Sequence, residues 1–374
     1  MARIVRVEVG RFDYALVGQF KFFRTRARAS VLVRLTDEDG VQGCGQSVPV
    51  ETWSYETLES VEATLAGYLA PAVLGANPGD LEEIHDRMEH AIRPSFSVGQ
   101  PLAKAGIDLA CYDLWGKQTR KSVASLLGGA RKTEIKLSWT VNATSLEKAE
   151  KLLEQGRAAG YDNFNLKLGP PQTPAYDLAL VRLAREFEPD GFHWGDANTG
   201  YDLDTALAQA PKLADLWLEA LESPLPPNRI SWYQSLRRQG ALPILMDEGI
   251  VSPVEAEEFI ALGMLDGIAM KVARCAGLWH ASRIVLALQR NGLKVFASGL
   301  TDPELSLAAS IHLFAWAGLE LPAALNGPQY IANRGTGDAA FRAVRYRVRL
   351  PAGPGLGVVL EERAEAALTM VARS

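Results

Sequence analysis

The sequence predicts an α/β protein in which a closed (β/α)8-type barrel follows a smaller N-terminal α+β unit. At 374 residues the chain is long enough for two domains, which usually hold about 100–200 residues each. Beyond the first unit, short apolar strands alternate with helix-length segments, which implies parallel strands joined by right-handed crossovers. Eight such units favour a closed barrel. An open doubly wound sheet is the alternative, but its glycine-rich dinucleotide fingerprint is absent.

The N-terminal unit is predicted to span residues 1–130. Alternating apolar and polar residues in RIVRVEVGRF and ASVLVRLTDEDGVQGCG indicate strands, and DEDG at 37–40 suits a tight turn. Helical patterns follow over residues 55–74, 80–91 and 100–117. The segment RKSVASLLGGARKT at 120–133, with its glycines and basic residues, indicates a domain junction.

The barrel is predicted to span residues 131–330. Its strand candidates are, in order, EIKLSWTV, NFNLKLG, GFHWGDAN, WLEALESP, LPILMDEG, LDGIAMKV, LKVFASGL and LPAALNGP. Helical patterns such as SLEKAEKLLEQGRAAG and SPVEAEEFIALG lie between them. Residues 331–374 add a strand-like piece, a Pro/Gly turn and a last helix, which we expect to pack back on the N-terminal unit.

Composition excludes several classes of function. A net charge of −5 without a basic stripe disfavours nucleic acid as a partner. The sequence contains no run of about 18 apolar residues without charge, so we expect no membrane-spanning helix. The N-terminus alternates apolar and polar residues and lacks the apolar run of a signal peptide. The three cysteines are widely spaced without a CxxC pair, so they predict neither disulfides nor a zinc site and fit the reducing cytoplasm.

Charged residues recur where the predicted barrel strands end. Those at the ends of strands two to six are Lys167, Asp196, Glu222, Asp247 with Glu248, and Lys271. Each alone is explained as a helix cap, a turn residue or a solvated lysine. Their spacing of 24 to 29 residues matches one βα repeat, however, so the sequence predicts that all of them point into the same barrel mouth.

This set of residues predicts a metal-assisted proton transfer. Carboxylates converging from Asp196, Glu222 and Asp247 repel one another unless neutralised, and an all-oxygen set suits Mg²⁺, with Mn²⁺ as an alternative, rather than zinc. A lysine near such a cation should have a lowered pKa and can act as a general base. The cation would acidify the α-proton of a bound carboxylate by stabilising the enolate. Lys167 and Lys271 could then remove and return the proton on opposite faces of a small carboxylate substrate.

The chain resembles the enolase superfamily and, within its mandelate racemase/muconate lactonizing enzyme family, the muconate lactonizing enzyme (muconate cycloisomerase) subgroup. The motifs that carry this resemblance cover nearly the whole chain: NLKLG at 165–169, GDANTGY at 195–201, LESPLPP at 221–227, MDEG at 246–249, MKVARCAGL at 270–278 and PGLGV at 354–358. The resemblance implies metal ligands at Asp196, Glu222 and Asp247, and acid/base lysines at Lys167 and Lys271. Asn198 and Glu248 would contact the ligands or the substrate.

The resemblance also implies the architecture of a modified (β/α)7β TIM-type barrel with an α+β capping domain. Two capping-domain loops, here 16–24 and 47–56, would control substrate choice. Their aromatic residues Phe20, Trp53 and Tyr55 either form an apolar lid over the substrate or pack at the domain interface. Because the family is commonly oligomeric, we expect a homo-oligomer.

Several positions depart from the family pattern. The subgroup usually has Lys-x-Lys on strand two, whereas this chain has Asn165 at the first position, which either weakens Lys167 as a base or contacts substrate. Asp302 on strand seven stands where relatives often have glutamate, and we count it as a candidate substrate contact. The strand-seven histidine of mandelate racemase-type members and the strand-eight Asp-x-Asp of dipeptide epimerases are both missing. His193, His280 and His312 are predicted to be structural.

The sequence therefore predicts a Mg²⁺-dependent racemase, epimerase or cycloisomerase that abstracts a proton next to a carboxylate. A dehydratase using the same site is the alternative, and so is an inactive homologue that keeps only the binding of metal and carboxylate.

Overall fold

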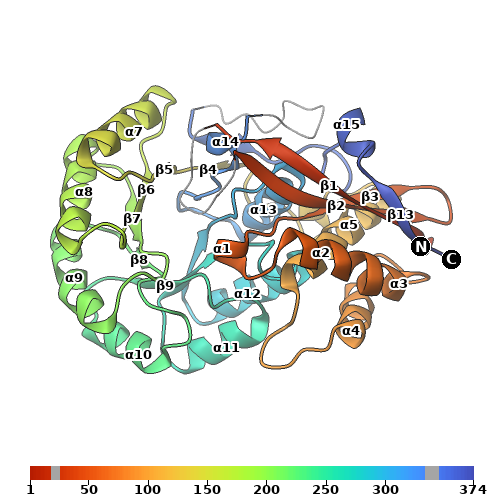
Figure 1. Ribbon diagram of the computed structural model, residues 1–374, viewed down its shortest axis with the longest axis horizontal. Coiled ribbons are helices and arrows are strands. Elements are labelled where there is room, and N and C mark those ends of the chain that lie inside the picture. The colour runs from red at the N-terminus through yellow and green to blue at the C-terminus, as the bar shows by residue number, and fades with distance from the viewer. Residues whose placement is uncertain (18–25, 333–344) are drawn as a thin grey trace.

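Two β-sheets, each covered by helices, account for most of the computed structural model, which describes residues 1–17, 26–332 and 345–374 (Figure 1). A four-stranded antiparallel sheet belongs to the cap, and a seven-stranded parallel sheet forms the barrel wall. The sequence-based expectation of a modified TIM-type barrel with an α+β cap is confirmed. None of the described helices is both long and apolar enough to span a membrane.

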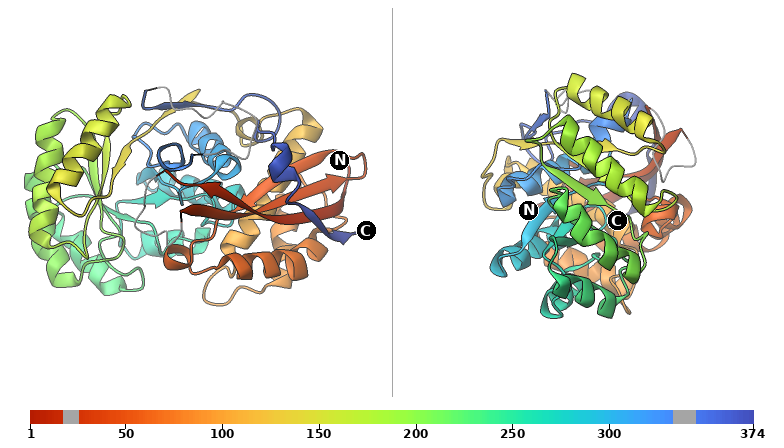
Figure 2. Two further views of the ribbon diagram at one scale, coloured as in Figure 1. Left: turned by 45° about the horizontal axis from the view of Figure 1, so that its top comes forward. Right: turned by 90° about the vertical axis from the view of Figure 1, so that its left-hand side faces the viewer.

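The cap sheet has the strand order β13-β1-β2-β3. Its strands are β1 (Ile4–Ala15), β2 (Ala27–Asp37), β3 (Gln42–Ser47) and β13 (Thr369–Arg373). The DEDG turn joins β2 to β3, where Gly40 adopts a φ of +80° that side-chain-bearing residues disfavour. Strand β13 pairs with β1, so the C-terminus returns to the cap and both chain ends lie close together (Figures 1 and 2).

Helices cover the cap sheet and lead into the barrel. They are α1 (Glu51–Ser54), α2 (Leu58–Thr64), the π-turn η1 (Leu65–Leu69), α3 (Ala70–Val73), α4 (Leu81–Ala91), α5 (Pro101–Thr119) and α6 (Val123–Leu126). The long α5 lies very close to β3, because a Cβ on Gly45 would stand 2.1 Å from the Gly106 carbonyl oxygen. Proline at the first position of α5 suits a helix start, where the backbone needs no N–H donor.

The barrel wall has the strand order β11-β10-β9-β8-β7-β6-β5. Its strands are β5 (Trp139–Val141), β6 (Phe164–Lys167), β7 (His193–Asp196), β8 (Leu221–Glu222), β9 (Ile244–Met246), β10 (Gly267–Met270) and β11 (Lys294–Ala297). Parallel bridges from Ala323 to Leu137 and from Ala324 to Ser298 join the two edges through the LPAALNGP segment. That eighth predicted strand is thus reduced to two bridges.

Two predicted elements were wrong in their extent. EIKLSWTV divides into β5 and β4 (Glu134–Lys136), and β4 pairs outside the barrel with β12 (Arg347–Arg349). The expected last helix is only the single turn α15 (Glu362–Glu365), because the residues after it extend to pair with β1 as β13. Both errors come from strand partners that lie more than 200 residues away in the sequence.

Amphipathic helices surround the barrel strands, and α7 to α11 form the outer ring at the end opposite the cap (Figures 1 and 2). The helices are α7 (Leu146–Ala158), α8 (Pro174–Phe187), α9 (Leu203–Asp215), α10 (Ile230–Gln239), α11 (Pro253–Ala261), α12 (Leu278–Arg290), α13 (Glu304–Ala317) and the short α14 (Gly327–Tyr330). Side chains cap several N-termini, among them Ser145 at α7 and Thr173 at α8.

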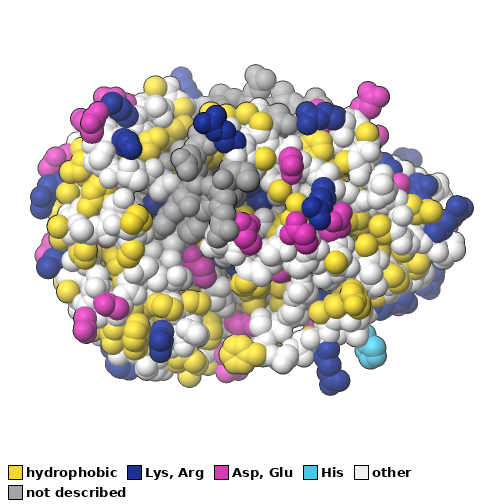
Figure 3. Space-filling view, in the orientation of Figure 1, with side chains coloured by type: hydrophobic (Ala, Val, Ile, Leu, Met, Phe, Trp, Pro, Cys, Tyr) yellow, Lys and Arg dark blue, Asp and Glu magenta, His cyan; other side chains and the backbone are white. Residues whose placement is uncertain are grey.

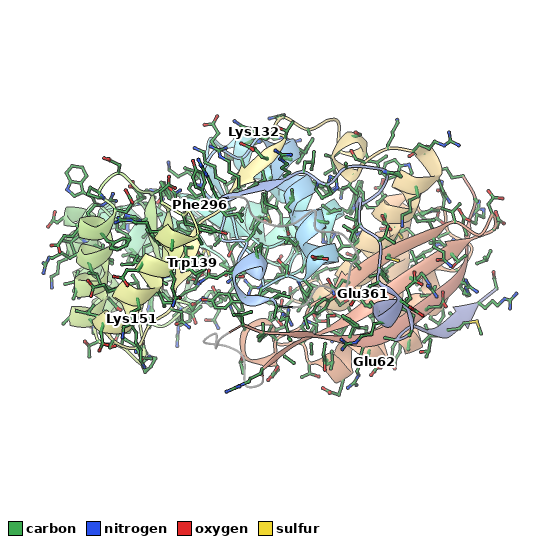
Figure 4. The ribbon with its side chains drawn as sticks, turned by 90° about the horizontal axis from the view of Figure 1, so that it is seen from above. Glu62, Lys132, Trp139, Lys151, Phe296 and Glu361 are labelled. Carbon is green, nitrogen blue, oxygen red and sulfur yellow. The ribbon has the colours of Figure 1, made fainter. Side chains whose placement is uncertain are left out.

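The barrel interior is filled by side chains rather than open. A buried cluster of Trp194, Ala220, Leu245, Ala269, Phe296 and Ala324 comes from successive strands, and Phe296 is labelled in Figure 4. The rings of Trp194 and Phe296 meet edge to face with centroids 5.8 Å apart. This apolar floor closes the barrel below its mouth, so polar side chains near the carboxyl ends of the strands lie above a dry core.

Candidate active site

The structure brings the predicted charged residues together at the carboxyl ends of the barrel strands. Lys167, Asp196 and Glu222 end β6, β7 and β8, and the strand register pairs Lys167 with Asp196 and Asp196 with Glu222. Asp247 and Lys271 immediately follow β9 and β10. All five are buried, with Lys167 the most exposed at 9%.

Each lysine is paired with a different carboxylate of this group. The Lys167 ammonium donates to Asp196 across 2.5 Å. Lys271 forms an ion pair with Asp247, donates to the Ser298 hydroxyl at 2.9 Å, and stands 3.9 Å from a Glu222 oxygen. Because β7, β8 and β9 separate β6 from β10, the two ammonium groups approach the three carboxylates from opposite sides.

Arg274 is a member of the site that the sequence reasoning missed. Its guanidinium forms an ion pair with Asp247 and is 1% exposed. The carboxylates of Asp247 and Glu248 raise the pKa of Arg274 against the lowering effect of burial. An arginine among the apolar residues of KVARCAGL was the signal that could have identified it, because a buried arginine needs a partner.

Burial sets the ionisation of the carboxylates. It raises the pKa of Glu222 to about 8, and the negative charge of Asp196 adds to that rise, while Lys271 opposes it. Burial likewise raises the pKa of Asp247, although Arg274 and Lys271 act in the opposite direction. One oxygen of Glu222 accepts from the Trp194 indole at 2.8 Å, and its other oxygen has no hydrogen-bond partner among the described residues.

Among the described side chains alone, the pKa of Lys167 is raised, and the lowered pKa expected beside a bound cation stays a prediction. Burial lowers the pKa of Lys167, but the carboxylates of Asp196 and Glu222 outweigh it, so the net pKa is raised. The expectation of a lowered pKa included a nearby cation, whose charge would act against those carboxylates. Lys167 is therefore an ammonium group in this arrangement.

Asn198, Glu248 and Trp53 link the site to the cap. The Asn198 amide donates to Asp196 at 3.0 Å and to Glu248 at 3.1 Å. The Trp53 indole, in the cap helix α1, donates to the same Glu248 oxygen at 3.2 Å. The Lys271 ammonium lies 5.0 Å from the centre of the Trp53 ring, a cation–π distance. Trp53 is thus both a wall of the site and a contact between cap and barrel.

Of three further predicted substrate contacts, the structure describes Tyr55 and Asp302. Tyr55 is 60% exposed, and Phe20 with most of loop 16–24 lies outside the described residues. Asp302 accepts from the Ser306 hydroxyl at 3.0 Å, so it serves the first turn of α13. Burial raises the pKa of Asp302, against the opposing charge of Arg28.

The remaining predicted residues are buried. Asn165 lies two residues before Lys167 in β6, and its side chain has no hydrogen-bond partner among the described residues. Burial lowers the pKa of His193 to about 4, of His280 to about 3 and of His312 to about 4. His193 and His312 contact backbone carbonyls, which agrees with a structural role.

The donor set fits a hard divalent cation. Three buried carboxylates on adjacent strands, one with an unpartnered oxygen and a raised pKa, present the oxygen ligands that Mg²⁺ prefers. As the described side chains lie, no group of three His, Cys, Asp or Glu residues converges closely enough to hold an ion, because Lys167, Lys271 and Arg274 occupy carboxylate oxygens. Asp196, Glu222 and Asp247 are nevertheless the described residues whose chemistry suits the metal.

A cavity of about 610 Å³ adjoins the site without containing the carboxylates. Its lining includes Lys167 and Gln172 from the β6 side and Asn142, Lys148 and Lys151 from the β5–α7 side. Lys151 is labelled on α7 in Figure 4. Elsewhere on the face shown in Figure 3, acidic and basic side chains are interspersed.

Two family models match the chain. The mandelate racemase/muconate lactonizing enzyme N-terminal domain matches residues 19–128, and the enolase C-terminal domain-like model matches residues 146–364. Muconate cycloisomerase 1 of Rhodococcus opacus is 30% identical over 368 residues, which cover 96% of each chain. N-succinyl-L-Arg/Lys racemase of Bacillus cereus is 27% identical over 341 residues, covering 89% of this chain and 88% of the relative.

Solved structures share the whole architecture. The N-succinyl Arg/Lys racemase of Bacillus cereus superposes with a TM-score of 0.91 at 24% identity, over 98% of this chain and 99% of the other. The 2-chloromuconate cycloisomerase of Rhodococcus opacus superposes with a TM-score of 0.89 at 25% identity, over 98% and 99%. Enzymes of the mandelate racemase/muconate lactonizing enzyme family are generally Mg²⁺-dependent.

Proposed function

The chain belongs to the mandelate racemase/muconate lactonizing enzyme family of the enolase superfamily, whose relatives here are isomerases, and we propose that it is a Mg²⁺-dependent isomerase acting next to a substrate carboxylate. The observation that carries the proposal is the placement of Lys167 and Lys271 on opposite sides of three buried carboxylates. Two ammonium groups so placed can serve the two faces of one carbon atom.

The carboxylates of Asp196, Glu222 and Asp247 would hold the metal. When bound, Mg²⁺ would supply positive charge that stabilises the negative charge developing on the substrate carboxylate. Lys167 and Lys271, no longer paired with carboxylates that would hold the cation, would be able to exchange protons with the substrate. One lysine, as a neutral amine, would take the α-proton and become an ammonium, and the other, as an ammonium, would give a proton to the opposite face and become an amine.

Neighbouring residues of the chain orient these groups. Ser298 accepts a hydrogen bond from Lys271, and the Trp53 ring lies against the same ammonium, so both restrict where its proton points. Asn198 bridges Asp196 and Glu248, which fixes these two carboxylates relative to each other. The buried apolar cluster around Trp194 excludes water from the barrel interior beneath the site, so charges in the barrel mouth interact in a low-dielectric setting.

Racemisation, epimerisation and cycloisomerisation all remain open, because they share the enolate step. The relatives named above include a muconate cycloisomerase and an N-succinyl-amino-acid racemase, which differ in substrate yet are both isomerases of carboxylates. We therefore propose the reaction step for this chain, and a carboxylate with an exchangeable α-proton as its substrate.

The proposal is tested by solvent exchange. The protein is incubated in D2O with Mg²⁺ and a panel of N-acylated amino acids and unsaturated dicarboxylates, and deuterium at the α-carbon is followed by NMR and mass spectrometry. We expect exchange that stops when EDTA is added and resumes with excess Mg²⁺. Loss of water from a substrate would instead identify a dehydratase. Tight binding of carboxylates with neither exchange nor product would refute isomerase chemistry.

A further inference from the structure

Two buried polar side chains beneath Lys167 lack partners. Asn165 in β6 is 1% exposed, and neither its Oδ1 nor its Nδ2 atom has a hydrogen-bond partner among the described residues. Thr140 in β5 is fully buried, and its hydroxyl is likewise unpartnered within the described part of the chain. Buried polar groups are rarely left unpaired in native proteins.

The two side chains share one face of the barrel wall. Thr140 and Asn165 are register partners on adjacent parallel strands, so their side chains project to the same side. Asn165 is also the register partner of Trp194, which lies in the barrel interior. Lys167, two residues further along β6, projects to that side too. The pair therefore lies level with Trp194 of the apolar floor, one interior layer below the Lys167 ammonium.

The neighbouring strands show that the interior layer of the barrel can be packed without polar side chains. Ala220, Leu245 and Ala269 fill the interior layer of β8, β9 and β10 with apolar groups. An apolar pair at positions 140 and 165 would avoid the cost of burying unpaired polar atoms. The retention of an amide and a hydroxyl points to a ligand that supplies their missing hydrogen bonds.

The atoms involved restrict the chemistry of that ligand. Asn165 Oδ1 needs a donor, whereas Asn165 Nδ2 needs an acceptor, and the Thr140 hydroxyl can be either. A carboxylate only accepts and an ammonium only donates, so each would leave one amide atom unpaired. A neutral hydroxyl both donates and accepts, and it is small enough for a fully buried position.

We propose that Asn165 and Thr140 form a subsite that binds a neutral hydroxyl group of the substrate, on the side of Lys167. The inference rests on the proposed function, because it places a carboxylate substrate in the barrel mouth. It assigns the substrate to the hydroxylated carboxylates and makes Asn165 and Thr140 specificity-determining residues.

The test compares matched ligands that differ in one hydroxyl. Calorimetry with Mg²⁺ present measures the binding of L-threonine against L-2-aminobutyrate, L-serine against L-alanine, and L-malate against succinate. We expect the wild type to bind the hydroxylated member at least tenfold more tightly in one or more pairs. In Asn165→Leu and Thr140→Val this preference falls below twofold, while affinity for the unhydroxylated member is kept. Thr133→Val, at an exposed position before β4 and outside the cavity that Lys167 lines, serves as the control and keeps the preference.

Urea unfolding distinguishes the loss of the subsite from a folding defect in the variants. Both variants remove unpaired buried groups, so their urea midpoints without ligand should equal or exceed that of the wild type. Equal affinity for both members of every pair, or binding of none, would overturn the subsite, as would a crystal structure in which only water meets Asn165 and Thr140. The subsite can fail in this way while α-proton exchange persists, whereas selective binding without exchange would leave the subsite standing and refute the proposed function.

Discussion

Replacing Arg28 by methionine tests what holds the cap over the barrel mouth. Arg28, in β2, is 1% exposed and donates to carbonyls of two separate segments. The acceptors before α1 are Val48 at 2.6 Å and Pro49 at 2.8 Å, and those after β11 are Leu300 at 3.1 Å and Thr301 at 3.3 Å. One side chain thus ties the loop before α1, the helix that carries Trp53, to a loop at the carboxyl end of the barrel.

The expected loss of stability follows from these contacts. Methionine fills similar volume but donates no hydrogen bond, so four buried carbonyls lose a partner, each at about 1–3 kcal/mol. Part of that loss is offset because the guanidinium charge is no longer buried. The burial of that charge is unfavourable: it lowers the pKa of Arg28 to about 10, against the opposing charge of Asp302. Removing one partner of such a buried charged network typically costs about 3–5 kcal/mol, which we adopt for Arg28→Met.

Urea unfolding followed by tryptophan fluorescence measures the effect. Arg11→Met is the matched control, because Arg11 lies in the neighbouring strand β1 and makes exposed ion pairs with Glu59 and Glu62, usually worth about 0–1 kcal/mol. We also expect kcat/KM to fall in Arg28→Met, because Trp53 would no longer be held against Glu248. Equal destabilisation by the two substitutions would refute the reasoning, as would unchanged kcat/KM in Arg28→Met.

Three further predictions concern the site and its surroundings. Lys271→Ala should lower turnover by about 10²–10⁴-fold, as loss of a general acid–base does, while Mg²⁺ binding by calorimetry is retained; an active variant would contradict the two-lysine assignment. Asp196→Asn should weaken Mg²⁺ binding by at least the roughly 10–100-fold typical of groups that merely support metal ligands, and unchanged affinity would remove Asp196 from the ligand set. Burial raises the pKa of Glu56 to about 7, although the N–H groups of Leu102 and Ala103 oppose it. The protonated Glu56 should therefore stabilise the fold fully below pH 4.5, and this contribution should be lost as the pH rises toward 7. Between these pH values, the free energy of unfolding should fall less in Glu56→Gln than in the wild type. Parallel curves of stability against pH for the two proteins would disprove the raised pKa.

The parts of the fold that depend on local pattern could be predicted from the sequence. Strands and helices differ in the spacing of their apolar residues, and this spacing can be read within a single segment. The barrel strands were therefore predicted close to where the structure has them. The errors concern partners: Glu134–Lys136 leaves the barrel because Arg347–Arg349 pairs with it, and Thr369–Arg373 extends because β1 offers an open edge. Local sequence carries no information about a partner so far away.

The candidate site shows the same division. Residues at strand ends could be found because spacing alone brings them to one mouth, as it does for Lys167, Asp196 and Glu222. Arg274 was missed because it lies three residues beyond Lys271 in a turn, where spacing does not show which way a side chain points. Asp302 stays a predicted substrate contact, and the bond that it accepts from the Ser306 hydroxyl in the next helix was not visible in the strand spacing. Side-chain direction after a strand is a property of the packed loops.

Charge balance explains why the change at position 165 bears on the metal. The described residues of the site include four carboxylates, Asp196, Glu222, Asp247 and Glu248, and three cations, Lys167, Lys271 and Arg274. A lysine at position 165, as in the Lys-x-Lys pattern, would bring the two signs into balance. With Asn165 these described carboxylates outnumber the cations by one, and one oxygen of Glu222 has no hydrogen-bond partner among the described residues, with Lys271 3.9 Å away. We therefore expect Asn165→Lys to weaken Mg²⁺ binding measured by calorimetry, because a fourth cationic side chain would repel the metal, and unchanged affinity would contradict this reasoning.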